Sequence, residues 1–209
     1  LYLNETTNVE EIFPQRRNAN GKFYVMDFTL SELQQLNVFE RFDPETGKNR
    51  YAGRFPTKMR IFKILSFSEY LELILGLNFS LKKKIGLFPE IKDPDYHAKL
   101  GFDLVRETLA ILDKYKLNHQ DAPIYLQSFE SSALKRIRYE FKSTVKLVQL
   151  IGENSWGDST CDQDYLKTEK GLREIKEYAI GIGPHLALLR KQKSNGQLKA
   201  SKFTKTAKR

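Results

Sequence analysis

Strand-like and helix-like stretches alternate along residues 66–189, and this alternation constrains the fold more than any other feature of the chain. Short apolar runs typical of strands are separated by stretches in which apolar residues recur every three or four positions, as on one face of a helix. The expected strands are Ile85–Phe88, Ile124–Phe129, Lys146–Ile151 and Gly181–Pro184. The expected helices begin at Ser66 and cover about Ala98–Leu117, Ser131–Phe141 and Thr168–Ala179. Successive strands joined by helices favour a parallel sheet, and hence an α/β fold.

The number of strand–helix units indicates how much of a known architecture the chain can build. A closed (β/α)8 barrel usually takes about 250 residues, whereas about four units are legible in the 209 residues of this sequence. We therefore expect a partial (β/α)8 TIM barrel, an arc of parallel strands. This expectation divides the chain into an N-terminal segment at 1–65, central βα units at 66–189 and a basic, disordered tail at 190–209.

The N-terminal segment lacks the regular alternation. Leu1–Lys22 has no apolar period and is expected to be a loop, and Phe23–Phe28 is a short strand candidate. Thr29 and Glu32 have the spacing of a capping box, in which the two side chains each accept a backbone N–H at the start of a helix. The stretch Asn37–Pro56 is irregular and, at about twenty residues, is long enough to suggest a functional or inserted segment.

The net charge of +9 is concentrated at one end of the chain. Residues 190–209 contain eight Lys or Arg and no Asp or Glu, which leaves +1 for residues 1–189. A nucleic-acid interface carries its positive charge on a folded face, so this distribution favours a solvated tail and no nucleic-acid partner. No apolar run approaches the ~20 residues that cross a bilayer. Cys161 is the only cysteine, which excludes an internal disulfide and a Cys-based zinc site.

The stretch Ile85–His97 carries the strongest candidate for chemistry. It runs from a short apolar strand through Pro-Glu-Ile-Lys to the breaker Asp93-Pro-Asp. Side chains on a strand alternate between its faces, so Glu90 and Lys92 are expected on the same side. They stand at the carboxyl end of the strand, the edge at which α/β folds bind their ligands.

Several stretches resemble, in the same order, the glycerophosphodiester phosphodiesterase family. They are IGLFPEIKDPDYH at Ile85–His97, IYLQSF at Ile124–Phe129 followed by the helix Ala133–Arg138, KLVQLIG at Lys146–Gly152, and EYAIGIGP at Glu177–Pro184. NGKFYVMDFTLSELQQL and YAGRFP resemble the insertion carried by the periplasmic bacterial branch of that family. The resemblance covers about Leu1–Pro184.

This resemblance implies a (β/α)8 barrel that hydrolyses a small-molecule glycerophosphodiester to an alcohol and glycerol 3-phosphate with a bound divalent cation, Ca²⁺ or Mg²⁺. The family's metal-binding Glu falls on Glu90, its phosphate-facing Lys on Lys92, and its substrate-binding Gln on Gln127. The chemistry of these residue types agrees, because a hard cation prefers carboxylate oxygens and an ammonium balances charge that builds on a phosphate.

The family's His-Arg-Gly, Glu-x-Asp and His-Asp motifs would precede residue 1, and its His-Pro segment is replaced by the basic tail. Those motifs supply the two catalytic histidines and two of the three metal carboxylates. His97 in a loop, His119 at the opposite end of the barrel and His185 after a strand match neither histidine. We therefore expect a fragment that is inactive alone. The resemblance implies a periplasmic location, or a cytoplasmic one if the parent has no signal peptide.

Without the resemblance, simpler interpretations exist. Glu90 and Lys92 would then be a surface ion pair worth under ~1 kcal/mol, and Gln127 is open between a ligand contact and a satisfied strand-end amide. Trp156 either anchors its loop or lines a pocket mouth. The helix side that carries Lys135, Arg136 and Arg138 is expected to face solvent.

Two rival functions remain at this point. One is a non-catalytic remnant or module that binds anionic surfaces through its basic tail, with a strong dependence on salt. The other is a different barrel enzyme acting on phosphate esters, such as the sphingomyelin-cleaving toxins, and the long segment Asn37–Pro56 argues against it.

Overall fold

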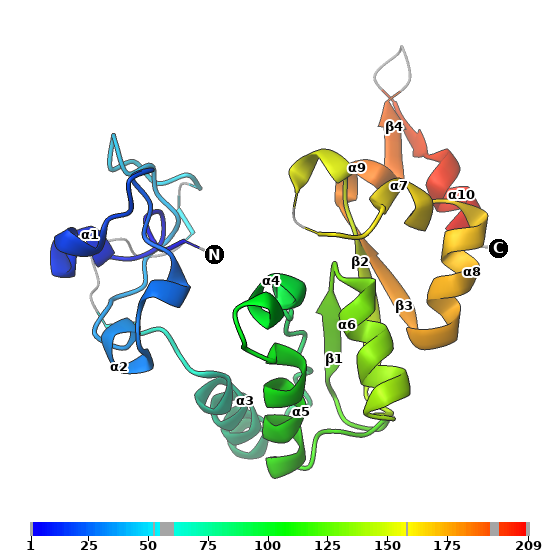
Figure 1. The fold of residues 1–209 in the computed structure, drawn as a ribbon, viewed down its shortest axis with the longest axis horizontal. Coiled ribbons are helices and arrows are strands. Elements are labelled where there is room, and N and C mark those ends of the chain that lie inside the picture. Colours follow the sequence, from blue (N-terminus) through cyan, green and yellow to red (C-terminus); the bar gives the residue numbers. More distant parts are fainter. Residues whose placement is uncertain (1, 52, 55–60, 158, 193–196, 208–209) are drawn as a thin grey trace. The chain divides into compact units, whose positions relative to one another are not determined.

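The computed structural model describes residues 2–51, 53–54, 61–157, 159–192 and 197–207, and the chain forms two compact units, Leu1–Leu73 and Ile74–Arg209. Figure 1 colours the first unit blue to cyan and the second teal to red. The sequence divides the chain at 65/66 and at 189/190, and that three-part division stays a prediction.

The first unit is built mostly from irregular chain. The helices that lie wholly within its described part are α1 (Val9–Ile12) and α2 (Leu30–Leu33), with 3₁₀ turns at Pro14–Arg16 and Val25–Asp27. The predicted loop at 1–22 therefore contains a helix and a 3₁₀ turn, and the predicted strand at 23–28 is wrong. That segment buries Phe23 and Phe28 through a 3₁₀ turn instead.

The capping box of the first unit is confirmed. The Thr29 side chain accepts the Glu32 N–H at 3.3 Å, and the Glu32 carboxylate accepts the Thr29 N–H at 2.8 Å, at the start of α2. Within 37–51 and 53–54 of the long predicted loop, strand pairing is limited to isolated bridges. Its remaining positions, 52, 55 and 56, lie outside the described residues.

The second unit contains a parallel sheet in the order β1–β2–β3, formed by Tyr125–Ser128, Lys146–Ile151 and Gly181–Pro184. Tyr125 pairs with Lys146, and Val148 with Gly181, so each strand pairs with the next along the chain. The three predicted strands and their parallel pairing are confirmed. The fold is α/β, as expected.

The predicted strand at 85–88 lies along β1 without forming a continuous ladder. Parallel bridges join Leu87 to Ile124 and Glu90 to Gln127. The Leu87 N–H donates to Pro123 O at 2.7 Å, and the Gln127 N–H donates to Pro89 O at 3.0 Å. Pro89 has no N–H to return to β1, and this missing donor interrupts the pairing.

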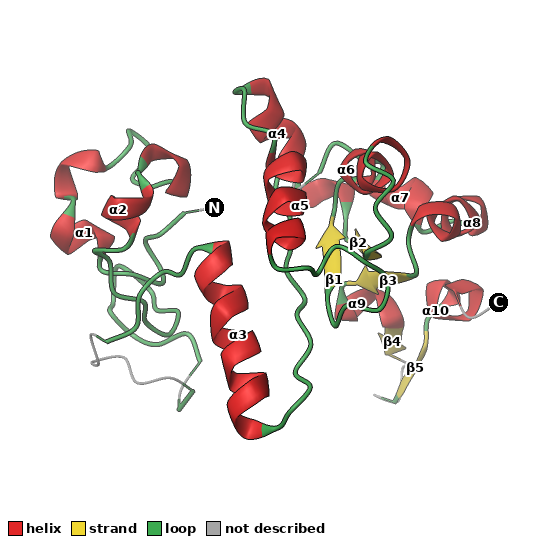
Figure 2. Ribbon diagram, turned by 90° about the horizontal axis from the view of Figure 1, so that it is seen from below, coloured by secondary structure: helices red, strands yellow, loops and turns green. Residues whose placement is uncertain are grey.

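Helices precede and connect the strands of the second unit (Figure 2). They are α4 (Pro94–Lys99), α5 (Leu104–Lys114), α6 (Ser131–Lys135) continued by a π-helical turn at Arg136–Glu140, α7 (Gln163–Leu166) and α8 (Glu169–Tyr178). α3 (Phe67–Leu81) begins where the second capping box predicts, because the Ser66 N–H donates to Glu69 at 2.7 Å.

Two expectations about these helices are corrected. The predicted helix at 98–117 is two helices, because Gly101 adopts φ +86° and Asp103 caps α5 by accepting the Arg106 N–H. The helix side predicted to face solvent instead bonds to its neighbours. Arg136 donates to Asp103 at 2.7 and 2.9 Å, Lys135 to Glu174 at 2.5 Å, and Arg138 to the Val145 carbonyl at 2.9 Å.

The core of the second unit lies between the sheet and its helices. Its fully buried side chains include Leu112, Ile124, Leu126, Leu134, Ile137, Leu147, Ile151 and Ile175. These positions come from the alternating strand faces and from one face of each helix, which is the pattern that the sequence predicts. Within the described residues, no helix is both long and apolar enough to cross a membrane.

The basic segment, expected to be disordered, contains regular structure where it is described. α9 (Leu186–Leu189) leads into an antiparallel pair, β4 (Arg190–Gln192) and β5 (Leu198–Ala200), followed by α10 (Lys202–Ala207). The Ser201 hydroxyl donates to Leu188 O at 2.6 Å, and the Thr204 hydroxyl to Leu189 O at 2.7 Å. These bonds hold α10 against the segment before β4.

Candidate active site

The carboxyl edge of the sheet brings together the residues that the sequence singled out. Glu90 and Lys92 both lie there, with the Lys92 Nζ 3.8 Å from the Glu90 Oε1. Their side chains are 31% and 26% exposed, respectively, so both remain accessible from solvent. Chain direction explains the position, because residues 87–91 run parallel to β1 and end at the same edge.

Gln127 is the direct neighbour of Glu90 across the parallel bridge. Its Nε2 donates to the Phe88 carbonyl at 3.1 Å. One N–H of the amide therefore helps to hold residues 85–91 against β1. Neighbouring positions on paired strands face the same side of a sheet. The structure thus places Gln127 beside Glu90, and its contact with substrate stays a prediction.

Ser128 fixes the backbone between Glu90 and Lys92, a role that the sequence did not reveal. Its buried hydroxyl donates to the Ile91 carbonyl at 2.8 Å and accepts the Glu130 N–H at 3.2 Å. A buried hydroxyl with both a donor and an acceptor partner holds its neighbours at low cost in desolvation. Ser128 is therefore a positioning residue for the two charged side chains.

Gln149 supports the same edge from β2. Its Nε2 donates to the carbonyls of Phe129 and Leu150, each at 2.9 Å, and its Oε1 accepts the Tyr178 hydroxyl at 2.9 Å. Burial raises the pKa of the Tyr178 hydroxyl above its usual range, so this hydroxyl stays protonated and donates. The Gln149 side chain is fully buried and has a structural role.

A second polar cluster lies beside the edge, around Glu130. This carboxylate is 3% exposed and accepts the Thr160 N–H at 2.7 Å, the Thr160 hydroxyl at 2.8 Å and the Cys161 thiol at 3.3 Å. Asp95 also accepts the Thr160 hydroxyl, at 3.1 Å. The cluster ties residues 159–161 to the ends of β1 and α4, a contact that no local sequence pattern indicates.

The three histidines lie in different places. His97 belongs to α4 rather than to a loop, because the Pro94 ring starts a helix after Asp93. His119 precedes β1, and its Nδ1 accepts the Asp121 N–H at 3.2 Å. His185 follows β3 at the carboxyl edge, where its ring contacts Trp156 edge-to-face at 5.0 Å between centroids.

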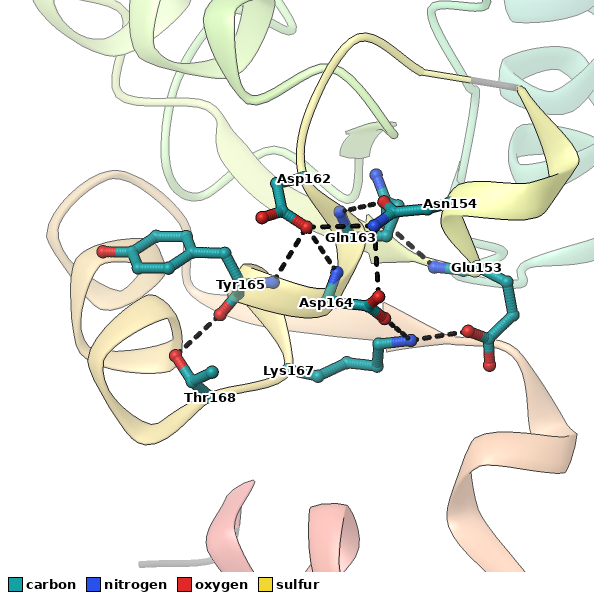
Figure 3. Close-up of polar contacts among 9 residues, drawn as sticks. Glu153, Asn154, Asp162, Gln163, Asp164, Tyr165, Lys167 and Thr168 are labelled. Carbon is teal, nitrogen blue, oxygen red and sulfur yellow. Dashed lines mark hydrogen bonds and ion pairs between the residues drawn. The ribbon is translucent and has the colours of Figure 1, made fainter.

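The loop after β2, which carries Trp156, is braced by side chains (Figure 3). Asn154 donates to Asp162 at 3.0 Å and to Asp164 at 3.2 Å, and its Oδ1 accepts the Gln163 N–H at 2.7 Å. Lys167 also joins this network, with its Nζ 2.7 Å from a carboxylate oxygen of Asp164 and 2.6 Å from one of Glu153. These bonds fix the loop relative to α7.

A complete metal site is not formed by the described residues, among which no group of three or more His, Cys, Asp and Glu side chains is placed to hold an ion. Glu90 offers one accessible carboxylate, and the neighbouring Lys92 opposes a cation at that point unless an anion lies between them. The side chains present therefore fit one ligand of a divalent cation.

A polar hollow of about 950 Å³ lies in the first unit, lined by Tyr2, Arg17, Lys22, Phe42, Lys48 and Arg50 among others. None of the residues predicted for the site lines it. We therefore place the candidate active site at the sheet edge, where parallel strands end and charged side chains meet.

Comparison with known proteins identifies the family. The sequence profile of the glycerophosphoryl diester phosphodiesterase family matches residues 2–207, so the match includes most of the basic segment. A glycerophosphodiester phosphodiesterase of Haemophilus influenzae is 36% identical over 199 residues, which are 88% of this chain and 55% of that protein. One of Treponema pallidum is 34% identical over 203 residues, 90% of this chain and 57% of that protein.

The chain thus spans little more than half the length of these curated relatives. The expected resemblance ended at residue 184, and the matched range carries it through β4, β5 and α10. The chain belongs to the glycerophosphoryl diester phosphodiesterase family.

Proposed function

We propose that the chain is part of a glycerophosphodiester phosphodiesterase, a hydrolase that converts glycerophosphodiesters to an alcohol and glycerol 3-phosphate. Family membership supports the reaction class. The observation that supports this choice of site is the Glu90–Lys92 pair. The two side chains lie 3.8 Å apart and are partly exposed at the carboxyl edge of a parallel sheet.

The proposal includes a partial (β/α)8 barrel. Its support is that β1, β2 and β3 are parallel, neighbour each other in sequence order, and are joined by helical crossovers. Parallel strands joined by helical crossovers are the repeating unit of the barrel. In such an arc the carboxyl edge becomes the mouth at which barrel enzymes place their substrates.

Each predicted side chain has a role at this mouth. The Glu90 carboxylate is one ligand of a divalent cation, Ca²⁺ or Mg²⁺, which when bound polarises a phosphoryl oxygen. The Lys92 ammonium contacts the phosphate and balances the charge that develops on it. Gln127 contacts a substrate hydroxyl with the part of its amide that does not bind Phe88 O.

Replacement of Glu90 tests the metal role. The chain, and any longer protein that contains it, is assayed with glycerophosphocholine and Ca²⁺ before and after addition of a chelator. We expect no metal-dependent turnover in Glu90→Gln, because an amide lacks the charge that a hard cation prefers. Glu107→Gln, an exposed carboxylate on α5, is the matched control and should keep full activity.

Replacement of Lys92 tests the phosphate role separately. Lys92→Met keeps most of the side-chain length and removes the charge, so we expect kcat/KM to fall about 10²–10³-fold while the dependence on Ca²⁺ concentration is retained. Turnover of Glu90→Gln that equals wild type would refute the metal assignment. Turnover of Lys92→Met that equals wild type would refute the phosphate assignment.

A further inference from the structure

The end of α3 leads into a short segment whose two ends are joined by one side chain. The Asn78 Oδ1 accepts the Ile85 N–H at 2.7 Å, and the Asn78 Nδ2 donates to the Ile85 carbonyl at 3.0 Å. The Lys83 N–H donates to the Asn78 carbonyl at 3.1 Å across Lys82, which adopts φ +52°, the left-handed conformation that commonly ends a helix. These bonds fix the ends of residues 79–85, which we call the lysine loop.

The lysine loop presents apolar side chains to solvent. All of its residues are exposed, and Figure 2 shows its later part as the green segment that leaves α3. Phe79, Leu81 and Ile85 are 79%, 57% and 41% exposed, respectively. Single exposed apolar residues are common on protein surfaces, whereas three of them within seven residues form a patch that favours a partner.

The charge of the loop has one sign. Residues 73–89 contain Lys82, Lys83 and Lys84 and no Asp or Glu. The Lys82 Nζ lies 5.1 Å from the centre of the Phe79 ring, so an ammonium and the most exposed ring of the loop lie together. The partner that complements this loop therefore offers negative charge and an apolar phase at the same place.

The lysine loop and the candidate active site lie at opposite ends of one chain segment. The loop leads into residues 85–91, which run parallel to β1, with Leu87 bridged to Ile124 at the start of β1 and Glu90 to Gln127 farther along. The loop thus stands at the amino edge of the sheet, whereas Glu90 lies at the carboxyl edge. A partner bound through the loop leaves the candidate active site open to solvent.

We propose that the lysine loop docks the protein on the surface of an anionic lipid bilayer. The ammonium groups are attracted by lipid phosphates, while the Phe79 ring and the Leu81 side chain enter the boundary between head groups and acyl chains. A nucleic acid would attract the charges but offers no apolar phase along its phosphate backbone. A stable protein partner takes about 20–30 residues a side, far more than this loop supplies.

Co-sedimentation with vesicles tests the docking. The purified chain is mixed with vesicles of phosphatidylcholine that contain about one-third phosphatidylglycerol, and with vesicles of phosphatidylcholine alone. We expect saturable binding to the anionic vesicles and about 10²-fold weaker binding to the neutral ones, as three lysines near the surface predict. Raising the salt from about 0.1 M to about 1 M should release the chain. Equal binding to both kinds of vesicle, or binding to neither, would overturn the proposal.

Two variants locate the contact on the loop. Phe79→Ser removes the most exposed ring, and we expect it to weaken binding to anionic vesicles about tenfold. Lys83→Gln combined with Lys84→Gln removes two charges and should weaken binding about fivefold for each. All three side chains are exposed, so the thermal unfolding of these variants should match that of wild type. Unchanged vesicle binding in both variants would overturn the proposal.

Matched controls remove the same groups elsewhere. Phe102→Ser removes a 60% exposed ring, and Lys199→Gln combined with Lys202→Gln removes two exposed charges from the basic segment. Both controls should bind anionic vesicles within about twofold of wild type. If the Lys199 and Lys202 control loses as much binding as the Lys83 and Lys84 variant, overall charge explains the attraction and the docking role of the loop falls.

Two further measurements separate a bilayer from other anionic partners. Inorganic phosphate and sodium chloride at equal ionic strength should release the chain from vesicles equally, because the lipid phosphates attract it as a surface. Greater release by phosphate would indicate a discrete anion site and overturn the proposal. Binding of duplex DNA that is tighter than binding of anionic vesicles, and that Phe79→Ser weakens equally, would assign the loop to nucleic acid instead. These measurements need neither metal nor turnover, so their outcome is independent of the proposed function.

Discussion

Each of the two compact units of the chain is stabilised internally by a different kind of contact. In Ile74–Arg209, β1, β2 and β3 pair over four residues at each of their two contacts. In the described part of Leu1–Leu73, strand pairing consists of isolated bridges, such as Tyr2–Tyr24 and Thr7–Val38. Among the described residues of the first unit, a small core is formed by Leu3, Val9, Phe23, Phe28, Leu33 and Leu36.

Polar side chains replace the missing ladders in the first unit. Asn4 donates to Gly21 O at 3.0 Å and accepts the Phe23 N–H at 2.9 Å, while the Asn8 Oδ1 accepts the Asn37 N–H at 2.7 Å. Side chains that bond backbone groups far along the chain satisfy those groups without regular secondary structure. One polypeptide therefore organises one unit by a periodic pattern and the other by individual amide contacts.

Core truncation in each unit should produce the largest effect. Leu147 on β2 and Leu36 in the first unit are both fully buried. We expect Leu147→Ala and Leu36→Ala each to lower the free energy of unfolding by about 2–5 kcal/mol, through lost apolar contact and the cavity left behind. Urea unfolding gives the size of the effect, and amide hydrogen exchange shows where protection is lost.

The exchange pattern distinguishes two units from one. If the units unfold separately, Leu147→Ala lowers protection at β1–β3 and leaves the Leu3 and Phe23 amides unchanged, and Leu36→Ala does the reverse. Loss of protection in both units after either substitution would contradict the comparison and indicate a single cooperative unit.

The same difference explains which parts of the fold were predictable. The strands at 125–128, 146–151 and 181–184 follow from apolar runs between helical patterns, and parallel pairing follows from their order. The strand expected at 23–28 is wrong because a 3₁₀ turn separates the buried Phe23 from the buried Phe28, and the Phe23 N–H donates to Asn4, nineteen positions away. Long-range amide contacts leave no period in the sequence.

The candidate site likewise contains some residues whose position the sequence predicted and others whose position it did not. The shared edge of Glu90, Lys92 and Gln127 was predictable, because strand alternation and parallel direction fix where such side chains lie. Ser128 and Glu130 were not, because their partners Ile91 and Thr160 become neighbours only after folding. The resemblance to a family supplied the roles of the site residues, since spacing alone could not separate a ligand set from an ion pair.

The loss of a helix cap should have a smaller effect on stability, and it can be compared directly between the units because each has a helix that begins at a capping Thr. Thr168 accepts the Gly171 N–H at 3.0 Å, donates to Tyr165 O at 2.7 Å, and starts α8, which buries Ile175 and Tyr178. We expect Thr168→Ala to lower the free energy of unfolding by about 1 kcal/mol. Thr29→Ala at the four-residue α2 should cost about 0.5 kcal/mol, near the lower end for such caps.

Thermal and urea unfolding of the two variants would measure this difference. A cost at Thr29 equal to or greater than that at Thr168 would show that the short α2 contributes as much to its unit as a packed helix does. Thr168→Ser, which keeps the hydroxyl, is the control and should restore most of the lost stability.

The ion pair between Asp103 and Arg136 gives an effect no larger than that of the Thr168 cap, and one that depends on pH. Hydrogen bonds from the Arg136 guanidinium hold the pKa of the Asp103 carboxyl well below its usual range. A carboxyl whose pKa is lower in the folded state stabilises the protein above its unfolded pKa, and this contribution is lost as the pH falls toward the folded value. Both side chains are about one-third exposed, so we expect Asp103→Asn to cost at most about 1 kcal/mol at neutral pH.

That cost should shrink as the pH falls below about 4, where the unfolded carboxyl begins to bind a proton. Asparagine still offers an oxygen to the Arg106 N–H, so the substitution removes the ion pair while keeping the cap of α5. Urea unfolding at several pH values, with Glu107→Gln as a matched carboxylate on the same helix, separates this pair from the general effect of acid. A difference between wild type and Asp103→Asn that stays constant from neutral pH down to about pH 2 would show that shape, rather than charge, joins α5 to the π-helical turn after α6.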